Sequence, residues 1–122
     1  MKKNISPEQF QEMFKVTPEK VTQTVNQLVA TYDPIYIYAF GSYASGKYDD
    51  DSDFDVMTVV DEYDDKPWKV IARGYGQLHG IKMPIDLLVY DNGKFEACKN
   101  DPTSFCHTIL KTGKLLYERK KS

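Results

Sequence analysis

The chain has only two cysteines, Cys98 and Cys106, and one tryptophan among its 122 residues. Two cysteines are too few for a disulfide scaffold, and their spacing does not match a zinc site. The sequence also lacks the run of about 20 apolar residues that a membrane-spanning helix needs. Its basic start leads directly into polar and charged residues, where a signal peptide would have an apolar run. We therefore expect a cytoplasmic protein with no membrane segment.

Positive charge is not in excess either. The formal net charge is −2 at pH 7. A protein that binds nucleic acid over a broad surface is normally basic, so no such surface is expected. Hydrophobic residues make up 41% of the chain and charged residues 28%, which is typical of a soluble globular domain. The length fits a single domain spanning residues 1–122.

The spacing of apolar residues predicts helices followed by alternating strands and helices. Helix-start signals at Ser6-Pro7 and Thr17-Pro18 precede apolar residues at helical spacing, which predicts N-terminal helices over about 6–32. Runs rich in β-branched and aromatic residues predict strands over 35–40, 53–60 and 84–90, with a helix over 67–80 between the last two.

Beyond the third strand, Asp91-Asn92-Gly93 predicts a turn, and a C-terminal helical segment is expected over about 94–118. The order of elements indicates an α/β (α+β) domain, in which helices pack on a small mixed β-sheet. The sequence contains no internal repeat and no interdomain linker.

Gly41-Ser42 directly follows the first predicted strand. Glycine allows the backbone to approach a ligand closely. Ser42 is expected to cap a short helical turn through Ala44 and Ser45, whose N–H groups could bind phosphate. By itself, this pair favours the simpler interpretation, an ordinary serine-capped turn between a strand and a helix.

Acidic residues gather at the entrance of the second predicted strand. Asp53 and Asp55 are two residues apart, so on a strand both carboxylates project from the same face. They repel each other unless a cation lies between them, and oxygen ligands favour Mg²⁺ or Mn²⁺. The other interpretation is a solvated acidic turn. Asp86 can join them if the third strand pairs beside the second; the other interpretation is an edge-strand aspartate that faces water.

The combined pattern resembles a known family. Gly41-Ser42, ten further residues, Asp53-Phe54-Asp55 and the later strand residue Asp86 resemble the nucleotidyltransferase superfamily that includes DNA polymerase β. The fuller pattern is similar to its minimal nucleotidyltransferase (MNT) branch, which is related to kanamycin nucleotidyltransferase. The resemblance covers about residues 34–90, the expected catalytic core, and implies the polymerase β-like nucleotidyltransferase fold.

The resemblance also implies an enzyme that moves a nucleoside monophosphate, AMP from ATP, to a hydroxyl acceptor. Asp53, Asp55 and Asp86 would form the catalytic set and bind Mg²⁺ or Mn²⁺. Asp86 would in addition deprotonate the acceptor hydroxyl. Gly41 and Ser42 would hold the triphosphate of the nucleotide.

One residue departs from the family pattern. Many relatives carry an arginine where this chain has Ser45, so a cation near the phosphates is missing unless Lys47 or Arg73 replaces it. Lys47 is therefore a further candidate for nucleotide binding. Tyr43 is another, because it lies inside the expected phosphate loop.

Single-domain members of this branch resemble antitoxins of two-gene systems. There the antitoxin adenylylates a tyrosine of a small helical toxin of the HEPN type, which makes such a toxin the expected protein partner. A homo-oligomer is also compatible with the sequence. The alternative is a binding module that keeps the fold and neutralises or scaffolds a partner with little or no catalysis; Ser45 favours it and the three aspartates oppose it.

Overall fold

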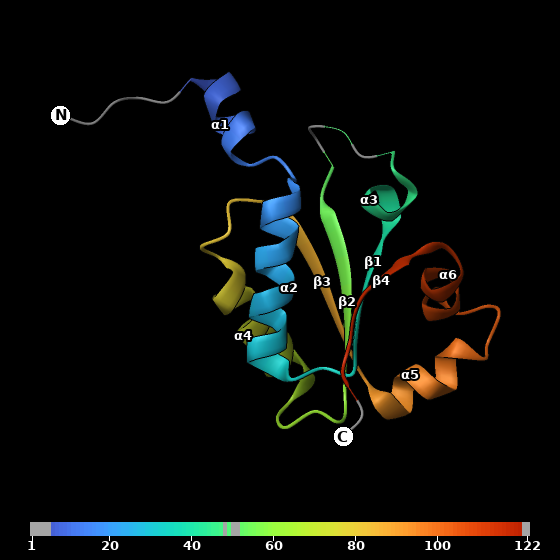
Figure 1. Ribbon diagram of the computed structural model, residues 1–122. Helices are drawn as coiled ribbons and strands as arrows, with labels where there is room; N and C mark the ends of the chain where they lie inside the picture. The colour runs from blue at the N-terminus through green and yellow to red at the C-terminus, as the bar shows by residue number, and fades with distance from the viewer. Residues whose placement is uncertain (1–5, 48, 50–51, 121–122) are drawn as a thin grey trace.

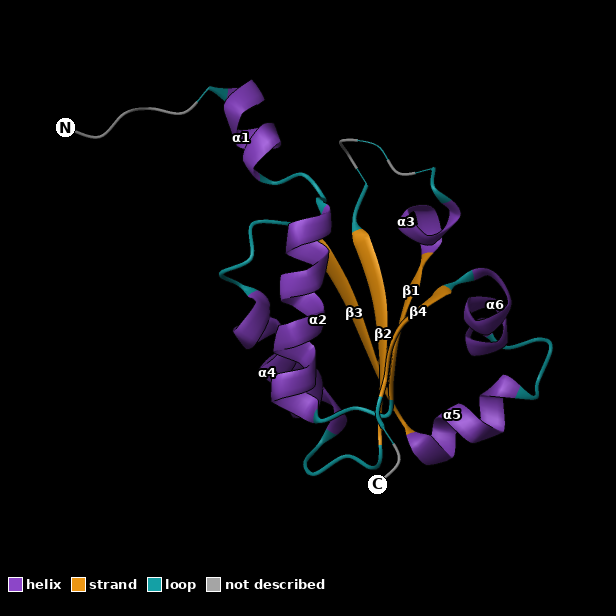
Figure 2. Ribbon diagram, viewed as in Figure 1, coloured by secondary structure: helices purple, strands orange, loops and turns teal. Residues whose placement is uncertain are grey.

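A four-stranded mixed sheet lies at the centre of the protein (Figures 1 and 2). The computed structural model describes residues 6–47, 49 and 52–120. The strands lie in the order β3-β2-β1-β4, with β2 and β3 parallel and the other two pairs antiparallel. They are β1 (Tyr36–Phe40), β2 (Phe54–Val60), β3 (Ile85–Asp91) and β4 (Lys114–Glu118).

Two pairs of helices cover the two faces of the sheet, α2 with α4 on one face and α5 with α6 on the other (Figure 2). The short helix α3 follows β1, and α1 stands away from the sheet (Figure 1). The helices are α1 (Pro7–Met13), α2 (Pro18–Tyr32), α3 (Gly41–Ser45), α4 (Pro67–Leu78), α5 (Asn92–Lys99) and α6 (Phe105–Thr112). The predicted small mixed sheet with helices packed on it is confirmed.

Strand β2 is buried on both faces, and this positions the acidic residues. Phe54 and Val56 belong to the core cluster beneath α2 and α4, whereas Met57 and Val59 belong to the cluster beneath α5 and α6. All four side chains have no exposed surface. A strand covered on both faces needs apolar residues at nearly every position, so carboxylates can be accommodated only near its entrance.

The C-terminal part differs from the sequence-based expectation. Asp91 does not begin a turn; its Oδ1 accepts a hydrogen bond from the Lys94 N–H at 2.7 Å and caps α5. The segment expected to be helical to about 118 is helical only to Thr112, and its last part is strand β4, which pairs with β1. A five-residue strand carries little periodic signal of its own, and only its pairing with β1, about 80 residues earlier, defines it.

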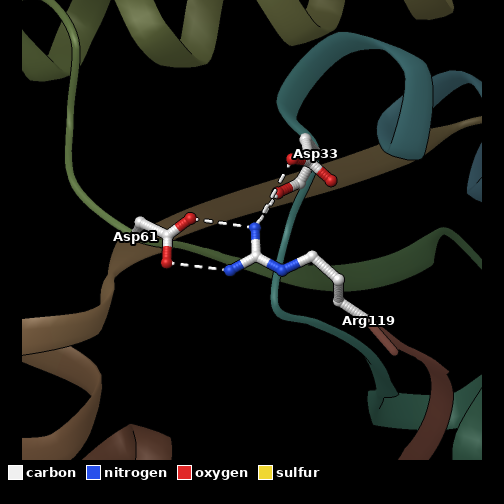
Figure 3. Close-up of polar contacts among 3 residues, drawn as sticks. All are labelled: Asp33, Asp61 and Arg119. Atoms are coloured by element: carbon white, nitrogen blue, oxygen red, sulfur yellow. Dashed lines mark hydrogen bonds and ion pairs between the residues drawn. The ribbon is translucent and has the colours of Figure 1, made fainter. Parts of the chain in front are cut away.

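Arg119 ties the end of β4 to two other elements (Figure 3). Its guanidinium forms a bidentate pair with Asp61, both N–O distances being 2.9 Å, and Nη1 also donates to the Asp33 carbonyl oxygen at 2.8 Å. Asp33 ends α2 in the left-handed conformation, with φ +46°, and Asp61 directly follows β2. One side chain thus joins the ends of α2, β2 and β4.

No helix in the described part of the chain is long and apolar enough to cross a membrane.

The contact between α2 and α4 depends on a small residue. Gly74 lies against the hydroxyl end of Tyr32, and this hydroxyl donates to the Val70 carbonyl oxygen at 2.5 Å. The absence of a side chain at Gly74 lets this ring reach across to α4.

Gly74→Ala should therefore destabilise the protein, although alanine is the better helix former. The new methyl group would clash with the Tyr32 hydroxyl and lie 2.7 Å from Leu87 Cδ2, so we expect a loss of about 1–3 kcal/mol. Gly76→Ala in the same helix is the matched control. No described atom lies within 4 Å of its added Cβ, so it should stabilise by up to about 1 kcal/mol. Urea unfolding measures both variants, and a Gly74→Ala protein as stable as Gly76→Ala would contradict this account.

Candidate active site

The register of the two parallel strands places two carboxylates side by side. Asp55 on β2 lies directly across from Asp86 on β3, and Asp53 immediately precedes β2. The expected pairing of the third predicted strand beside the second is thus confirmed. Asp53 and Asp86 are exposed and Asp55 is half-buried, so this end of the sheet is accessible to solvent. Since Met57 and Val59 face α5 and α6, the alternation along β2 puts Asp55 on that same face.

Gly41 brings the backbone after β1 against the Asp55 carboxylate. Phe40, the last residue of β1, pairs with Asp55 across the sheet. Gly41 has a φ of +71°, which side chains rarely adopt, and a Cβ there would collide with Asp55 Oδ2. The strand-to-helix turn and the acidic strand can approach this closely only because position 41 is glycine.

Helix α3 begins one residue earlier than the predicted serine cap. The N-cap is Phe40, and Ser42 lies inside the first turn, so the expectation that Ser42 caps the turn is wrong. The carbonyl oxygen of Ser42 accepts hydrogen bonds from the Ser45 hydroxyl at 3.1 Å and from the Lys47 N–H at 3.0 Å, and these bonds close the end of the helix. Serine caps a helix only when its backbone is extended, and here Phe40 takes that conformation, with φ −139°.

The remaining residues expected near the phosphates lie in different parts of the structure. The Tyr43 ring packs edge-on against Phe54, with centroids 5.1 Å apart, so the ring contributes to the core. Lys47 is exposed just after α3. Arg73 lies on α4, behind the opposite face of the sheet, where it pairs with Asp64 at 3.2 Å. Arg73 therefore does not replace the arginine that Ser45 displaces.

Electrostatic repulsion concentrates at Asp55. Burial raises the pKa of this carboxyl above its ordinary value, and the charges of Asp86 and Asp53 raise it further. Asp86 and Asp53 are therefore close enough to Asp55 to disfavour its charged form, and a bound cation would relieve this repulsion. Within residues 6–47, 49 and 52–120, no three acidic, histidine or cysteine side chains already stand in a metal-binding arrangement. The all-carboxylate donor set nevertheless fits a hard divalent ion such as Mg²⁺ or Mn²⁺.

A cavity of about 320 Å³ opens beside Asp55 and reaches α6. Phe40, Gly41 and Asp55 line it from the sheet side, and Phe105 and Thr108 are among the α6 residues that line the other side. Sequence reasoning missed the α6 residues, because they follow Asp55 by about 50 positions and match no motif. No sequence pattern marks them; only the fold shows that Phe105, a large apolar side chain, remains 55% exposed.

Comparison with known proteins identifies the family. The model of the family "Polymerase beta, Nucleotidyltransferase" matches residues 23–122. The chain therefore belongs to the polymerase β-type nucleotidyltransferase family, as its motif predicts, and it has the fold of that family. A search of curated proteins gave no significant match.

Two solved structures share this fold at low sequence identity. A protein from Sulfolobus solfataricus, provisionally assigned as a nucleotidyltransferase, is 22% identical with a TM-score of 0.57, over 100% of this chain and 96% of that one. A toxin–antitoxin structure with AMP-PNP is 20% identical with a TM-score of 0.52, over 86% of this chain and 76% of that one.

Asp55→Asn should raise the melting temperature of the metal-free protein at neutral pH. The folded-state pKa of Asp55 lies above its unfolded value, so the ionised carboxylate destabilises the fold above that pKa. This destabilisation shrinks as the pH falls through the folded-state pKa and is gone below about 4, the unfolded-state pKa, where the carboxyl is protonated in both states. The stabilising effect of asparagine should shrink over the same range. Thermal melts in a chelating buffer measure it.

Asp61→Asn serves as the control of opposite sign. The hydrogen bond from Arg119 lowers the pKa of Asp61, so the ionised carboxylate stabilises the fold above the unfolded pKa, and this contribution is lost as the pH falls through the lowered value. This variant should melt below the wild type at neutral pH. An Asp55→Asn protein that also melts below the wild type would show that Asp55 is not under repulsion.

Proposed function

We propose that this protein is a metal-dependent nucleotidyltransferase that transfers AMP from ATP to a hydroxyl group of a partner protein. The observation that carries the proposal is the pairing of Asp55 with Asp86 across two parallel strands, with the Gly41 backbone against the Asp55 carboxylate. Membership of the nucleotidyltransferase family supports it. The arrangement places carboxylates, a close-approaching backbone and an open cavity at one end of the sheet.

In this proposal the three aspartates bind the metal ion, and one of them has a second role. Asp53, Asp55 and Asp86 hold Mg²⁺ or Mn²⁺, which neutralises the phosphate charges when bound. Asp86, on β3 and exposed, accepts the proton of the acceptor hydroxyl. The acceptor oxygen forms a bond to the α-phosphorus while the bond from that phosphorus to the pyrophosphate oxygen breaks. Gly41 and Ser42 orient the triphosphate, and the exposed Lys47 side chain adds a cation nearby.

The acceptor we propose is a tyrosine of a helical, HEPN-type toxin, with this protein as the antitoxin. One solved structure with the same fold is a toxin–antitoxin with AMP-PNP, an analogue of ATP. This supports both an adenine nucleotide and a protein partner. The competing function is a binding module without catalysis. It is favoured by Ser45, which stands where relatives carry a cation and whose hydroxyl bonds within α3.

Mg²⁺ or Mn²⁺ should raise the melting temperature, because the ion relieves carboxylate repulsion in the folded state only. The double variant Asp53→Asn, Asp55→Asn should lose this shift. The double variant Glu62→Gln, Asp65→Asn removes two exposed acidic charges outside the site and should keep it. If the first double variant keeps the full shift, the ion binds elsewhere.

Asp86→Asn should abolish most of the transfer while preserving nucleotide binding. The substitution removes the proposed base and one metal ligand, so transfer should fall by on the order of 10²-fold or more. The protein is incubated with Mg²⁺, ATP labelled at the α-phosphate and the polypeptide encoded by the adjacent gene, and the label on that polypeptide is counted. Glu62→Gln controls for the loss of one exposed negative charge.

The outcomes separate the two functions. Equal labelling by the wild type and Asp86→Asn would remove Asp86 from the reaction. A wild-type protein that binds the partner polypeptide tightly but leaves it unlabelled would favour the binding module.

A further inference from the structure

The cavity beside Asp55 has a definite position relative to the reacting groups. The sheet order β3-β2-β1-β4 places Asp86 on one side of Asp55 and Gly41, at the end of β1, on the other. The cavity lies on the β1 side, between Gly41 and helix α6. An acceptor that gives its proton to Asp86 approaches from the β3 side. The cavity on the β1 side is then left for the nucleotide.

The lining of the cavity fits the nucleoside half of that nucleotide. Its volume of about 320 Å³ lies at the lower end of the range for ligand pockets, roughly 300–1,000 Å³. Phe40, Phe105 and Ile109 make it mostly apolar, and Asp55 places one end of it at the acidic cluster. A triphosphate is too polar for an apolar lining, whereas a flat base is not.

Phe105 is the residue best placed to recognise a base. Its side chain is 55% exposed, although it is a large aromatic group next to the core. It meets Phe40 edge-on, with centroids 5.5 Å apart and an interplanar angle of 87°. An edge-on contact leaves a face of the Phe105 ring available for stacking. Base–aromatic stacking contributes about 1–3 kcal/mol when measured by alanine substitution.

Two threonines of α6 add polar contacts at the same wall. The Thr112 hydroxyl donates to the Thr108 carbonyl oxygen at 2.8 Å, and the Thr108 hydroxyl donates to the Ser104 carbonyl oxygen at 3.5 Å. Because each hydroxyl hydrogen is directed to the helix backbone, each hydroxyl oxygen retains lone pairs. These oxygens can accept from an amino group of a base or a hydroxyl group of a ribose.

We propose that α6 forms the nucleoside-binding wall of this protein and that Phe105 stacks on the base, with Thr108 and Thr112 as polar contacts. The inference rests on the proposed function, since it assumes that a nucleoside triphosphate binds at the acidic cluster. It assigns recognition of the base to a helix outside the motif, on residues that the Gly-Ser and Asp-x-Asp pattern does not include.

The test compares two ligands that share a triphosphate. Calorimetry with Mg²⁺ measures binding of α,β-methylene-ATP, which this transfer cannot cleave, and of inorganic tripolyphosphate, which has no nucleoside. Phe105→Ala should weaken binding of the nucleotide by about tenfold or more and leave tripolyphosphate unchanged. Phe105→Leu keeps an apolar contact with Phe40 but has no ring, so it should lose affinity as well. Phe105→Tyr keeps the ring and should retain it.

Trp68→Ala is the matched control, because Trp68 is also an exposed aromatic residue but lies on α4, behind the opposite face of the sheet. It should leave both affinities unchanged. Wild-type nucleotide affinity in Phe105→Ala, with tripolyphosphate still bound, would overturn the inference and leave the proposed function standing. Full affinity in Phe105→Leu would reduce Phe105 to a packing residue. Failure of the wild type to bind either ligand would overturn the proposed function, and this inference with it.

Discussion

The parallel pairing of β2 with β3 is the interaction on which the rest of the site depends. A shift of one residue in this register would move Asp86 to the opposite face of the sheet from Asp55. Such a shift is strongly opposed, because it would also remove Leu87 and Val89 from the core cluster beneath α2 and α4 and turn them to the other face of the sheet. The hydrophobic packing along β2 and β3 thus holds the carboxylates together near the start of both strands, against their mutual repulsion.

This arrangement destabilises the ionised Asp55 carboxylate at a position where a bound ligand can reduce the repulsion. Burial and two neighbouring negative charges raise the pKa of Asp55, so the ion-free protein keeps a carboxylate in unfavourable surroundings. Structural carboxylates are normally paired with cations, as Asp61 is with Arg119 at the far end of β2. The two ends of one strand therefore differ: the Asp61 end ties secondary-structure elements together, and the Asp55 end holds an accessible carboxylate with a raised pKa. Perturbed carboxylates in an accessible position are typical of functional sites.

Helix α6 connects the packing of the fold to the chemistry of the site. On its buried side, Cys106 and Ile109 complete the core cluster beneath α5 and α6. Toward solvent it presents Phe105 and Thr108 to the cavity beside Asp55. A helix that must pack on the sheet for stability is thereby held rigidly against the acidic cluster. A wall built on such an element can position a ligand with little loss of conformational entropy on binding.

The sequence by itself determined the local features of this protein. Apolar periodicity predicts α2, α4 and the three strands of the core, and the spacing of Gly41, Asp53, Asp55 and Asp86 indicates the family, because strand alternation and turn chemistry act over a few residues. It misplaced the helix cap at Ser42, since the backbone of Phe40 rather than a side chain decides where α3 begins. Only the tertiary structure decided that Lys114–Glu118 is a strand, that Arg73 lies behind the sheet and that Phe105 lines the same cavity as Asp55. Each of these depends on contacts between segments dozens of residues apart, which the packing of the whole sheet selects and no local pattern encodes.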